Sequence, residues 1–229
     1  MREQNTRAAA PAILFDLDGT LTDPVEGITR SIEHALDSLG GQRRTRAELA
    51  AYIGPPLRGT FTFLLETEDP LVVEHAMSLY RERFSVLGLF ENEVYAGVPE
   101  MLRTLVALDY RLYIATSKPR IYAARIVAHF SLAQYFIGVY GSELDGRHDN
   151  KRELIAYLLQ QEQLSPAATA MVGDRSHDIV AAKQNGLRAI GVSYGYGSYD
   201  ELVEACADHI CRSPADVVAI FEHGDQAFS

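Results

Sequence analysis

The feature of this sequence that most constrains its fold is a repeated alternation between short apolar runs and helical patterns. The runs are rich in β-branched and aromatic residues and cover residues 12–15, 111–115, 136–140, 168–172, 188–193 and 209–211. Amphipathic stretches with helix start and stop signals lie between most of them. Strands that alternate with helices form a parallel sheet with helices on both faces. The sequence therefore predicts an α/β fold with a Rossmann-like parallel-sheet core.

One long segment interrupts this alternation. Residues 24–93 contain no convincing strand and show amphipathic helical patterns around residues 28–39, 49–53, 61–65 and 71–84. Because the segment directly follows the first strand, it should lie over the carboxyl ends of the strands, where open α/β sheets bind ligands. We therefore expect two domains, a catalytic core formed by residues 11–23 and 94–229 and an inserted all-helical cap domain formed by residues 24–93.

The charge and hydropathy of the chain restrict the class of molecule that it could bind. The formal net charge is −10, whereas a nucleic-acid or anionic-membrane surface ordinarily shows a basic stripe. No apolar run approaches the ~18 residues of a membrane-spanning helix, and residues 1–11 lack the apolar stretch of a signal peptide. We expect a cytoplasmic protein that acts on a small diffusible molecule, and the sequence leaves its oligomeric state open. Cys206 and Cys211 lack metal-ligand spacing and are assigned no function.

Two acids follow the first apolar run. Asp16 and Asp18 stand two positions apart before the turn residue Gly19. Side chains with this spacing on a strand point to the same side. An isolated pair of this kind is commonly a surface or turn feature, but its place at the tip of an apolar strand favours a functional site. Neighbouring carboxylates raise one another's pKa, so one acid could serve as a nucleophile while the other moves a proton.

A second acidic motif ends the run at residues 168–172. Gly173 allows close approach to a ligand, and Asp174 should point toward the same place as Asp16. Two carboxylates, waters and a substrate phosphate are a ligand set that suits Mg²⁺. A plain helix cap before Ser176 is the alternative role for Asp174.

Groups suited to binding phosphate follow other strands. Thr116 and Ser117 end the second apolar run and offer hydroxyls and backbone N–H groups. Lys151 opens a helix after a polar loop, and its ammonium could neutralise a transferring phosphoryl group. Each residue alone would be an ordinary turn or surface feature, so their order and setting carry the prediction.

Together these motifs resemble the haloacid dehalogenase-like hydrolases, in particular phosphatases with a helical cap inserted after the first strand. The resemblance rests on Asp16-x-Asp18-x-Thr20, Thr116, Lys151 and Gly173-Asp174-x-x-x-Asp178, and it extends over essentially the whole chain from residue 13. It implies a Mg²⁺-dependent phosphoric monoester hydrolase that forms an aspartyl phosphate.

The resemblance also implies a role for each residue. Asp16 would be the nucleophile and a metal ligand. Asp18 would be the general acid/base and would reach the metal through its backbone carbonyl. Asp174 would supply the other carboxylate ligand, and Asp178 would orient the ligands or a metal-bound water. Thr116, Ser117 and Lys151 would bind the phosphoryl group.

The substrate is less constrained. The segments 141–147 and 195–198 look like those of a branch described as 5′-nucleotidases, whereas the chain as a whole also looks like phosphoglycolate phosphatases. We therefore expect nucleoside 5′-monophosphates first and phosphoglycolate second. Arg58, in the loop 53–58 of the expected cap, could contact the far end of a substrate, and a solvated helix face is its alternative setting.

Three other functions compete with a phosphatase. A dehalogenase would not need the second acid at Asp18. A phosphosugar mutase would share the aspartyl phosphate but exclude water, so only its products distinguish it from a hydrolase. A phospho-accepting regulatory module also gathers acids around Mg²⁺ at strand ends, but it would need neither a cap nor a general acid.

Overall fold

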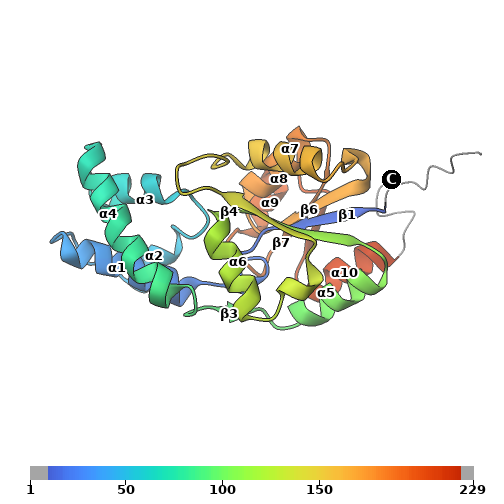
Figure 1. The fold of residues 1–229 in the computed structure, drawn as a ribbon, viewed down its shortest axis with the longest axis horizontal. Coiled ribbons are helices and arrows are strands. Elements are labelled where there is room, and N and C mark those ends of the chain that lie inside the picture. The colour runs from blue at the N-terminus through green and yellow to red at the C-terminus, as the bar shows by residue number, and fades with distance from the viewer. Residues whose placement is uncertain (1–9, 223–229) are drawn as a thin grey trace, which may run out of the picture.

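A six-stranded parallel sheet forms the centre of the molecule. The computed structural model describes residues 10–222, and its sheet has the strand order β5-β4-β1-β6-β7-β8 (Figure 1). Every neighbouring pair is parallel. The strands are β1 (Ala12–Phe15), β4 (Arg111–Pro119), β5 (Gly138–Ser142), β6 (Thr169–Gly173), β7 (Arg188–Val192) and β8 (His209–Cys211). The α/β fold expected from the sequence is confirmed.

Helices cover both faces of this sheet (Figure 1). One face carries α7 (Lys151–Gln161), α8 (Ser176–Gln184) and α9 (Tyr199–Glu204); the other carries α5 (Val98–Ala107), α6 (Arg120–His129) and α10 (Pro214–Glu222). In β1, Leu14 packs in the cluster of the first face, whereas Phe15 packs in the cluster of the second. A strand covered on both sides buries alternate side chains in two cores, which explains why β1 is apolar throughout.

A group of helices lies at one end of the molecule, at the left of Figure 1. It contains α1 (Val25–Ser38), α2 (Arg46–Ala50), α3 (Leu57–Leu64), α4 (Pro70–Arg83) and the π-helix η1 (Phe84–Gly88). The α2 helix begins earlier than residue 49, where the sequence pattern started it. Thr45 and Glu48 form a capping box there, which fixes the helix start locally.

Two very short strands join this helical group to the sheet. β2 (Thr22–Asp23) and β3 (Glu93–Val94) pair antiparallel at the points where the chain leaves the core and returns to it. The amide of Asn92 reinforces the pair by donating to the Thr22 hydroxyl at 3.4 Å. Strands of two residues are too short to produce a hydropathy pattern, and the sequence analysis missed them.

Four strands differ from their expected bounds. β6 covers Thr169–Gly173 rather than residues 168–172, and β7 ends at Val192 rather than at residue 193. β4 continues through Thr116 to Pro119, and its register with β5 shifts between these residues. β5 begins at Gly138 rather than at residue 136. Short 3₁₀ helices, η2 (Ala133–Tyr135) and η3 (Pro166–Ala168), precede β5 and β6.

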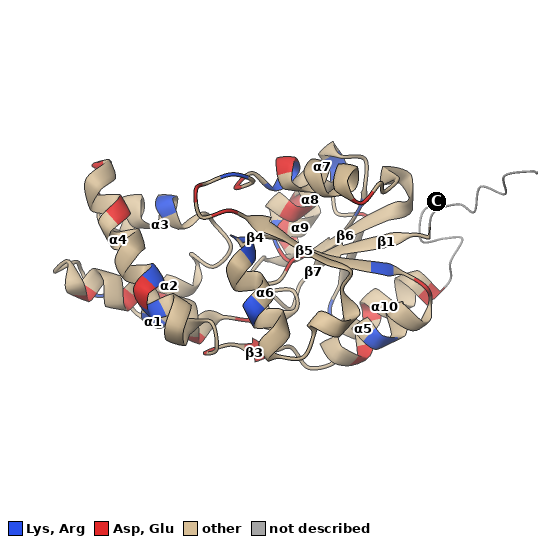
Figure 2. Ribbon diagram, in the orientation of Figure 1, with Lys and Arg blue, Asp and Glu red and all other residues tan. Residues whose placement is uncertain are grey.

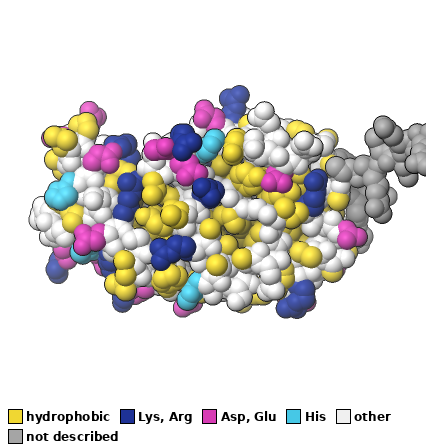
Figure 3. All heavy atoms as spheres, in the orientation of Figure 1, with side chains coloured by type: hydrophobic (Ala, Val, Ile, Leu, Met, Phe, Trp, Pro, Cys, Tyr) yellow, Lys and Arg dark blue, Asp and Glu magenta, His cyan; other side chains and the backbone are white. Residues whose placement is uncertain are grey.

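The surface carries charges of both signs. Figure 2 shows acidic and basic residues on the sheet core and on the helical end alike, and the face in Figure 3 mixes them with hydrophobic side chains. Within residues 10–222, no helix is long and apolar enough to cross a membrane. The prediction that residues 1–11 lack a signal peptide concerns mainly residues 1–9, which lie outside the described residues.

Candidate active site

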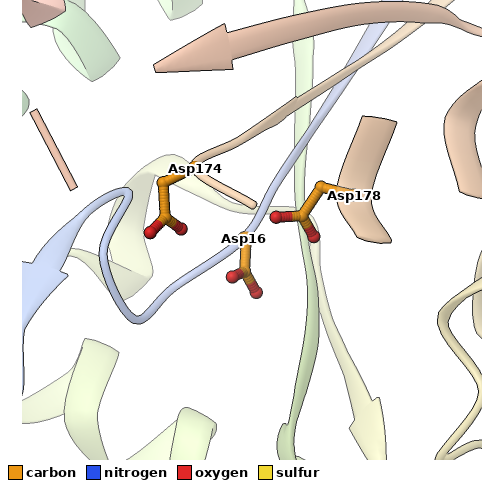
Figure 4. A group of neighbouring side chains, drawn as sticks. All are labelled: Asp16, Asp174 and Asp178. Atoms are coloured by element: carbon orange, nitrogen blue, oxygen red, sulfur yellow. The ribbon is translucent and has the colours of Figure 1, made fainter. Parts of the chain in front are cut away.

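Three buried carboxylates meet at the carboxyl edge of the sheet. Asp16 follows β1, Asp174 follows β6, and Asp178 lies in the first turn of α8. Figure 4 shows their side chains converging, and one oxygen of each lies within 4.8 Å of the others. Asp16 is 5% exposed, and the other two are fully buried. The parallel topology brings these residues together, because β1 and β6 are neighbours that end at the same edge.

Hydrogen bonds and close backbone contacts fix this group. Asp174 accepts from the Thr20 hydroxyl at 3.2 Å and from the backbone N–H of Tyr196 at 2.9 Å. The backbone N–H of Arg175 donates to Asp178 at 3.1 Å. A Cβ at Gly19, whose φ is +85°, would lie 2.2 Å from Asp174. The turn therefore needs glycine for both its left-handed conformation and its closeness to the acid.

Lys151 is the basic partner of this cluster. It is the first residue of α7, where Asn150 caps the helix by accepting from two backbone N–H groups. Its buried ammonium lies 2.9 Å from Asp16 Oδ1 and 2.8 Å from Asp178 Oδ1. Burial works against the charged lysine, but the two carboxylates together raise its pKa above the ordinary value. Burial likewise opposes ionisation of Asp178, but the charges of Lys151 and His177 and the hydrogen bonds from Lys151 and Arg175 together outweigh it, so the pKa of Asp178 is lowered.

The electrostatics of Asp174 test whether the cluster fits a metal ion. Burial, together with the charges of Asp16 and Asp178, raises its pKa to about 8. A bound cation would reverse this repulsion, and buried carboxylate oxygens are the donors that hard divalent ions prefer. The donor set therefore fits a divalent metal. The Asp18 side chain does not belong to this group of three carboxylates. Its predicted contact with the metal would therefore be made by its backbone carbonyl.

The Asp18 side chain instead pairs with a lysine that the sequence analysis did not assign. Lys118 Nζ lies 2.7 Å from Asp18 Oδ2, and both side chains are nearly buried. Burial raises the pKa of Asp18 even though Lys118 lowers it. The other oxygen, Oδ1, is buried and has no hydrogen-bond partner among the described residues. The two-residue spacing from Thr116, which is typical of one strand face, was the signal that could have identified Lys118.

The expected phosphate-binding residues lie beside this pair. Thr116 is buried, and its hydroxyl accepts from the backbone N–H of Lys118 at 3.2 Å. The Ser117 carbonyl accepts from the Ser142 hydroxyl at 2.9 Å. Thr116 and Ser117 both line the same cavity as Asp16 and Asp18. The structure therefore gathers all the residues of the four motifs at one edge of the sheet.

That cavity lies between the sheet edge and the helical group. Its volume is about 490 Å³, and its lining is partly apolar and partly charged. Arg58 lines it too, but it lies in the first turn of α3 rather than in a loop, and its guanidinium is ion-paired with Glu74 of α4. The apolar part comes mainly from the helical group, with residues Ile28, Ile32, Tyr52, Leu57, Met77, Tyr80 and Phe84.

Fold and site define an α/β enzyme with a carboxylate and lysine centre suited to phosphoryl transfer. A family model described as haloacid dehalogenase-like hydrolase matches residues 13–192. The chain belongs to this family, as the motifs predicted.

Relatives of known name and structure agree with this assignment. A 5′-nucleotidase of Pseudomonas aeruginosa is 48% identical over 212 residues, 93% of this chain and 96% of the relative. The tyrosine-protein kinase PtkA of Mycobacterium tuberculosis is 36% identical over 200 residues, 85% of this chain and 67% of that protein. A phosphoglycolate phosphatase of Vibrio vulnificus is 28% identical, over 94% of this chain and 97% of that one.

Among solved structures, a predicted phosphatase from Clostridium acetobutylicum superimposes with a TM-score of 0.88 at 37% identity, covering 94% of this chain and 100% of that one. Family, relatives and structural neighbours confirm the enzyme class expected from the sequence, a phosphoric monoester hydrolase.

Proposed function

We propose that this enzyme is a Mg²⁺-dependent phosphatase that transfers the phosphoryl group of a small phosphomonoester to Asp16 and then to water. The observation that carries the proposal is the setting of Asp16. Its carboxylate is nearly buried, one oxygen is held by Lys151, and it shares a cavity with Asp18 and Thr116. A positioned carboxylate beside a general acid is the arrangement that covalent phosphoryl transfer requires.

In the first half-reaction, a carboxylate oxygen of Asp16 forms a bond to phosphorus while the bond to the leaving oxygen breaks. Asp18 gives its proton to that oxygen. In the second half-reaction, Asp18 takes a proton from water, whose oxygen attacks phosphorus and releases Asp16 and inorganic phosphate. Lys151, Thr116 and Ser117 bind the phosphoryl oxygens, and Asp178 holds Lys151 in place, since the two side chains are 2.8 Å apart.

The metal ligands would be Asp16, Asp174 and the backbone carbonyl of Asp18. Mg²⁺ bound there would offset the negative charge of the phosphoryl group and of the carboxylates. This assignment uses two members of the acidic cluster in Figure 4 and leaves the third, Asp178, to Lys151.

We assign the catalytic core to residues 11–23 and 94–229 and the cap to residues 24–93. The antiparallel pair β2 and β3 supports this division, because it lies at the two crossings of the chain. The cap contributes most of the apolar wall of the cavity, so it would bind the leaving group rather than the phosphoryl group.

Nucleoside 5′-monophosphates are our first substrate class. A cavity of about 490 Å³ with aromatic side chains is far larger than phosphoglycolate needs, and it suits a planar base and a ribose. The nucleotidase relative is also more similar to this chain than the phosphoglycolate phosphatase relative is. Phosphoglycolate remains the alternative substrate.

A phospho-accepting module or a phosphotransferase is the alternative of another class, and the PtkA relative is the observation that favours it. Phosphate release from nucleoside monophosphates, phosphoglycolate, sugar phosphates and a phosphotyrosine peptide, with and without Mg²⁺, tests the proposal. We expect Mg²⁺-dependent release that is fastest with nucleoside monophosphates. A stable phosphoprotein without turnover, or transfer of phosphate to another hydroxyl compound, would instead support the alternative.

A further inference from the structure

One arginine of the catalytic core forms a hydrogen bond with the cap. Arg175 Nη1 donates a hydrogen bond of 2.9 Å to the backbone carbonyl of Ile53, which lies 122 positions away in the sequence. Ile53 begins the stretch that we call the loop 53–58, which ends with Leu57 and Arg58, the first two residues of α3. Residues 54–58 all line the cavity. The hydrogen bond therefore attaches a wall of the cavity to the core.

Other contacts keep the Arg175 side chain in this orientation. Its Nε lies 3.1 Å from Glu201 Oε1, and the same oxygen accepts from the backbone N–H of Ser176 at 2.7 Å. Arg175 and Glu201 are both largely shielded, with side chains 20% and 24% exposed. A guanidinium presents several donors in a rigid fork, so it can bind Glu201 and the Ile53 carbonyl at once.

The cap loop is shaped to pass close to this arginine. Gly54 has φ +103°, a left-handed conformation, and a Cβ there would lie 3.4 Å from Arg175 Nη1 and 3.7 Å from His177 Cε1. A side chain at this position would be strained in its backbone and would contact the arginine. The loop backbone thus follows the core surface closely at Gly54.

Arg175 also stands between two acids of the catalytic cluster. It directly follows Asp174, and its backbone N–H binds Asp178 at 3.1 Å. The turn that presents these acids therefore also holds the loop that carries Arg58. This side chain therefore helps to set the distance between the phosphoryl site and the far wall of the cavity.

We infer that Arg175 is a specificity-determining positioning residue that holds the loop 53–58 at the distance required by a large leaving group. The inference rests on the proposed function in that a nucleoside would fill this part of the cavity. A leaving group too small to reach the loop gains little from the contact. Substitution of Arg175 should therefore weaken the binding of bulky substrates more than it slows phosphoryl transfer.

The test compares Arg175→Met and Arg175→Lys with wild type on a nucleoside 5′-monophosphate and on acetyl phosphate, whose leaving group is small. We expect Arg175→Met to raise KM for the nucleotide roughly tenfold, the scale of one hydrogen bond to a charged group. Its effect on kcat, and on either constant for acetyl phosphate, should be much smaller. Arg175→Lys should fall between, because lysine keeps the charge but lacks the fork. Arg103→Met, which removes an exposed arginine of α5, is the matched control.

Hydrogen exchange gives a readout that needs no substrate. The backbone amides of residues 52–58 should exchange faster in Arg175→Met than in wild type or Arg103→Met. The inference would be overturned if Arg175→Met lowered kcat/KM equally for both substrates. It would also be overturned if hydrogen exchange of the amides of residues 52–58 stayed unchanged. If the wild type hydrolyses acetyl phosphate but no nucleotide, the proposed substrate is wrong, and exchange alone then decides the role of Arg175.

Discussion

Lys118 holds one oxygen of Asp18 and leaves the other without a partner. Nζ lies 2.7 Å from Oδ2, whereas Oδ1 is buried and unbonded among the described residues. The same ammonium lies 4.5 Å from the ring centroid of Phe84, which is the first residue of the π-helix. The register shift of β4 occurs at this lysine. Irregular strands and π-helices commonly serve to aim side chains at functional sites.

This relationship predicts that Lys118→Met misplaces the general acid. The value of kcat for an alkyl phosphate should fall by up to about 100-fold, the lower end of what general acid–base catalysis contributes. The loss should be smaller with p-nitrophenyl phosphate in the step that forms the intermediate, because that leaving group needs little protonation. Lys183→Met, at a surface ion pair with Asp208, is the control. Equal losses on both esters would contradict the positioning role.

Asp16→Asn should abolish turnover and preserve the fold. The change removes the nucleophile but keeps nearly the same volume, so circular dichroism and the melting temperature should stay close to wild type. Asp200→Asn, at an exposed position of α9, controls for loss of a single carboxylate. A purified Asp16→Asn enzyme with activity near wild type would exclude covalent catalysis by this residue.

Asp18→Asn separates proton transfer from metal binding. If only the backbone carbonyl of Asp18 contacts Mg²⁺, the affinity for Mg²⁺ should change little while turnover collapses. Dephosphorylation should stay slow with every substrate, because water activation is the same each time. Mass spectrometry after rapid quench should then detect phospho-Asp16 formed from p-nitrophenyl phosphate. Loss of Mg²⁺ binding in this variant would show that its side chain is a ligand.

Removal of divalent metal should silence the enzyme. EDTA should abolish phosphate release and added Mg²⁺ should restore it. Asp174→Asn should raise the Mg²⁺ concentration for half-maximal activity by more than about 10-fold, since even residues that only support metal ligands contribute that much. Full activity in metal-free buffer would refute the metal site.

The free energy of unfolding should depend on pH through Glu91, which lies just before β3. Hydrogen bonds from Arg83, at 2.7 and 2.8 Å, hold the pKa of this carboxylate below its ordinary value of 4.5, and Arg30 adds to the effect. A lowered pKa stabilises the fold above the unfolded value and loses that contribution as the pH falls through the folded value.

Glu91→Gln should therefore lower the free energy of unfolding by roughly 0.5–1 kcal/mol at pH 7, the upper part of the range for ion pairs at a protein surface. The difference from wild type should shrink as the pH falls below 4.5. Urea unfolding at pH 7 and at a pH below 4.5 measures this difference in the free energy of unfolding. Glu68→Gln, in the exposed turn before α4, is the control. A difference that persists at low pH would point to packing rather than charge.

The sequence by itself determined the parallel sheet and the placement of the motif acids. Local hydropathy specifies strands such as β1, and parallel strands end at one edge, so Asp16 and Asp174 were expected at the same edge of the sheet. Their close approach follows from the pairing of β1 with β6. Lys151 at the start of α7 followed from the same reasoning.

Only the tertiary structure decided the pairings between distant residues. The Lys118 and Asp18 pair lies where the register of β4 shifts, and the Arg175 contact with Ile53 joins residues 122 positions apart. Hydropathy periodicity reports which face of an element is buried, but it carries no information on which charged side chains meet across that face. For Lys118 and Asp18 that choice depends on the pairing of β1 with β4, and for Arg175 and Ile53 it depends on the packing of the cap against the core. Both exist only in the folded chain.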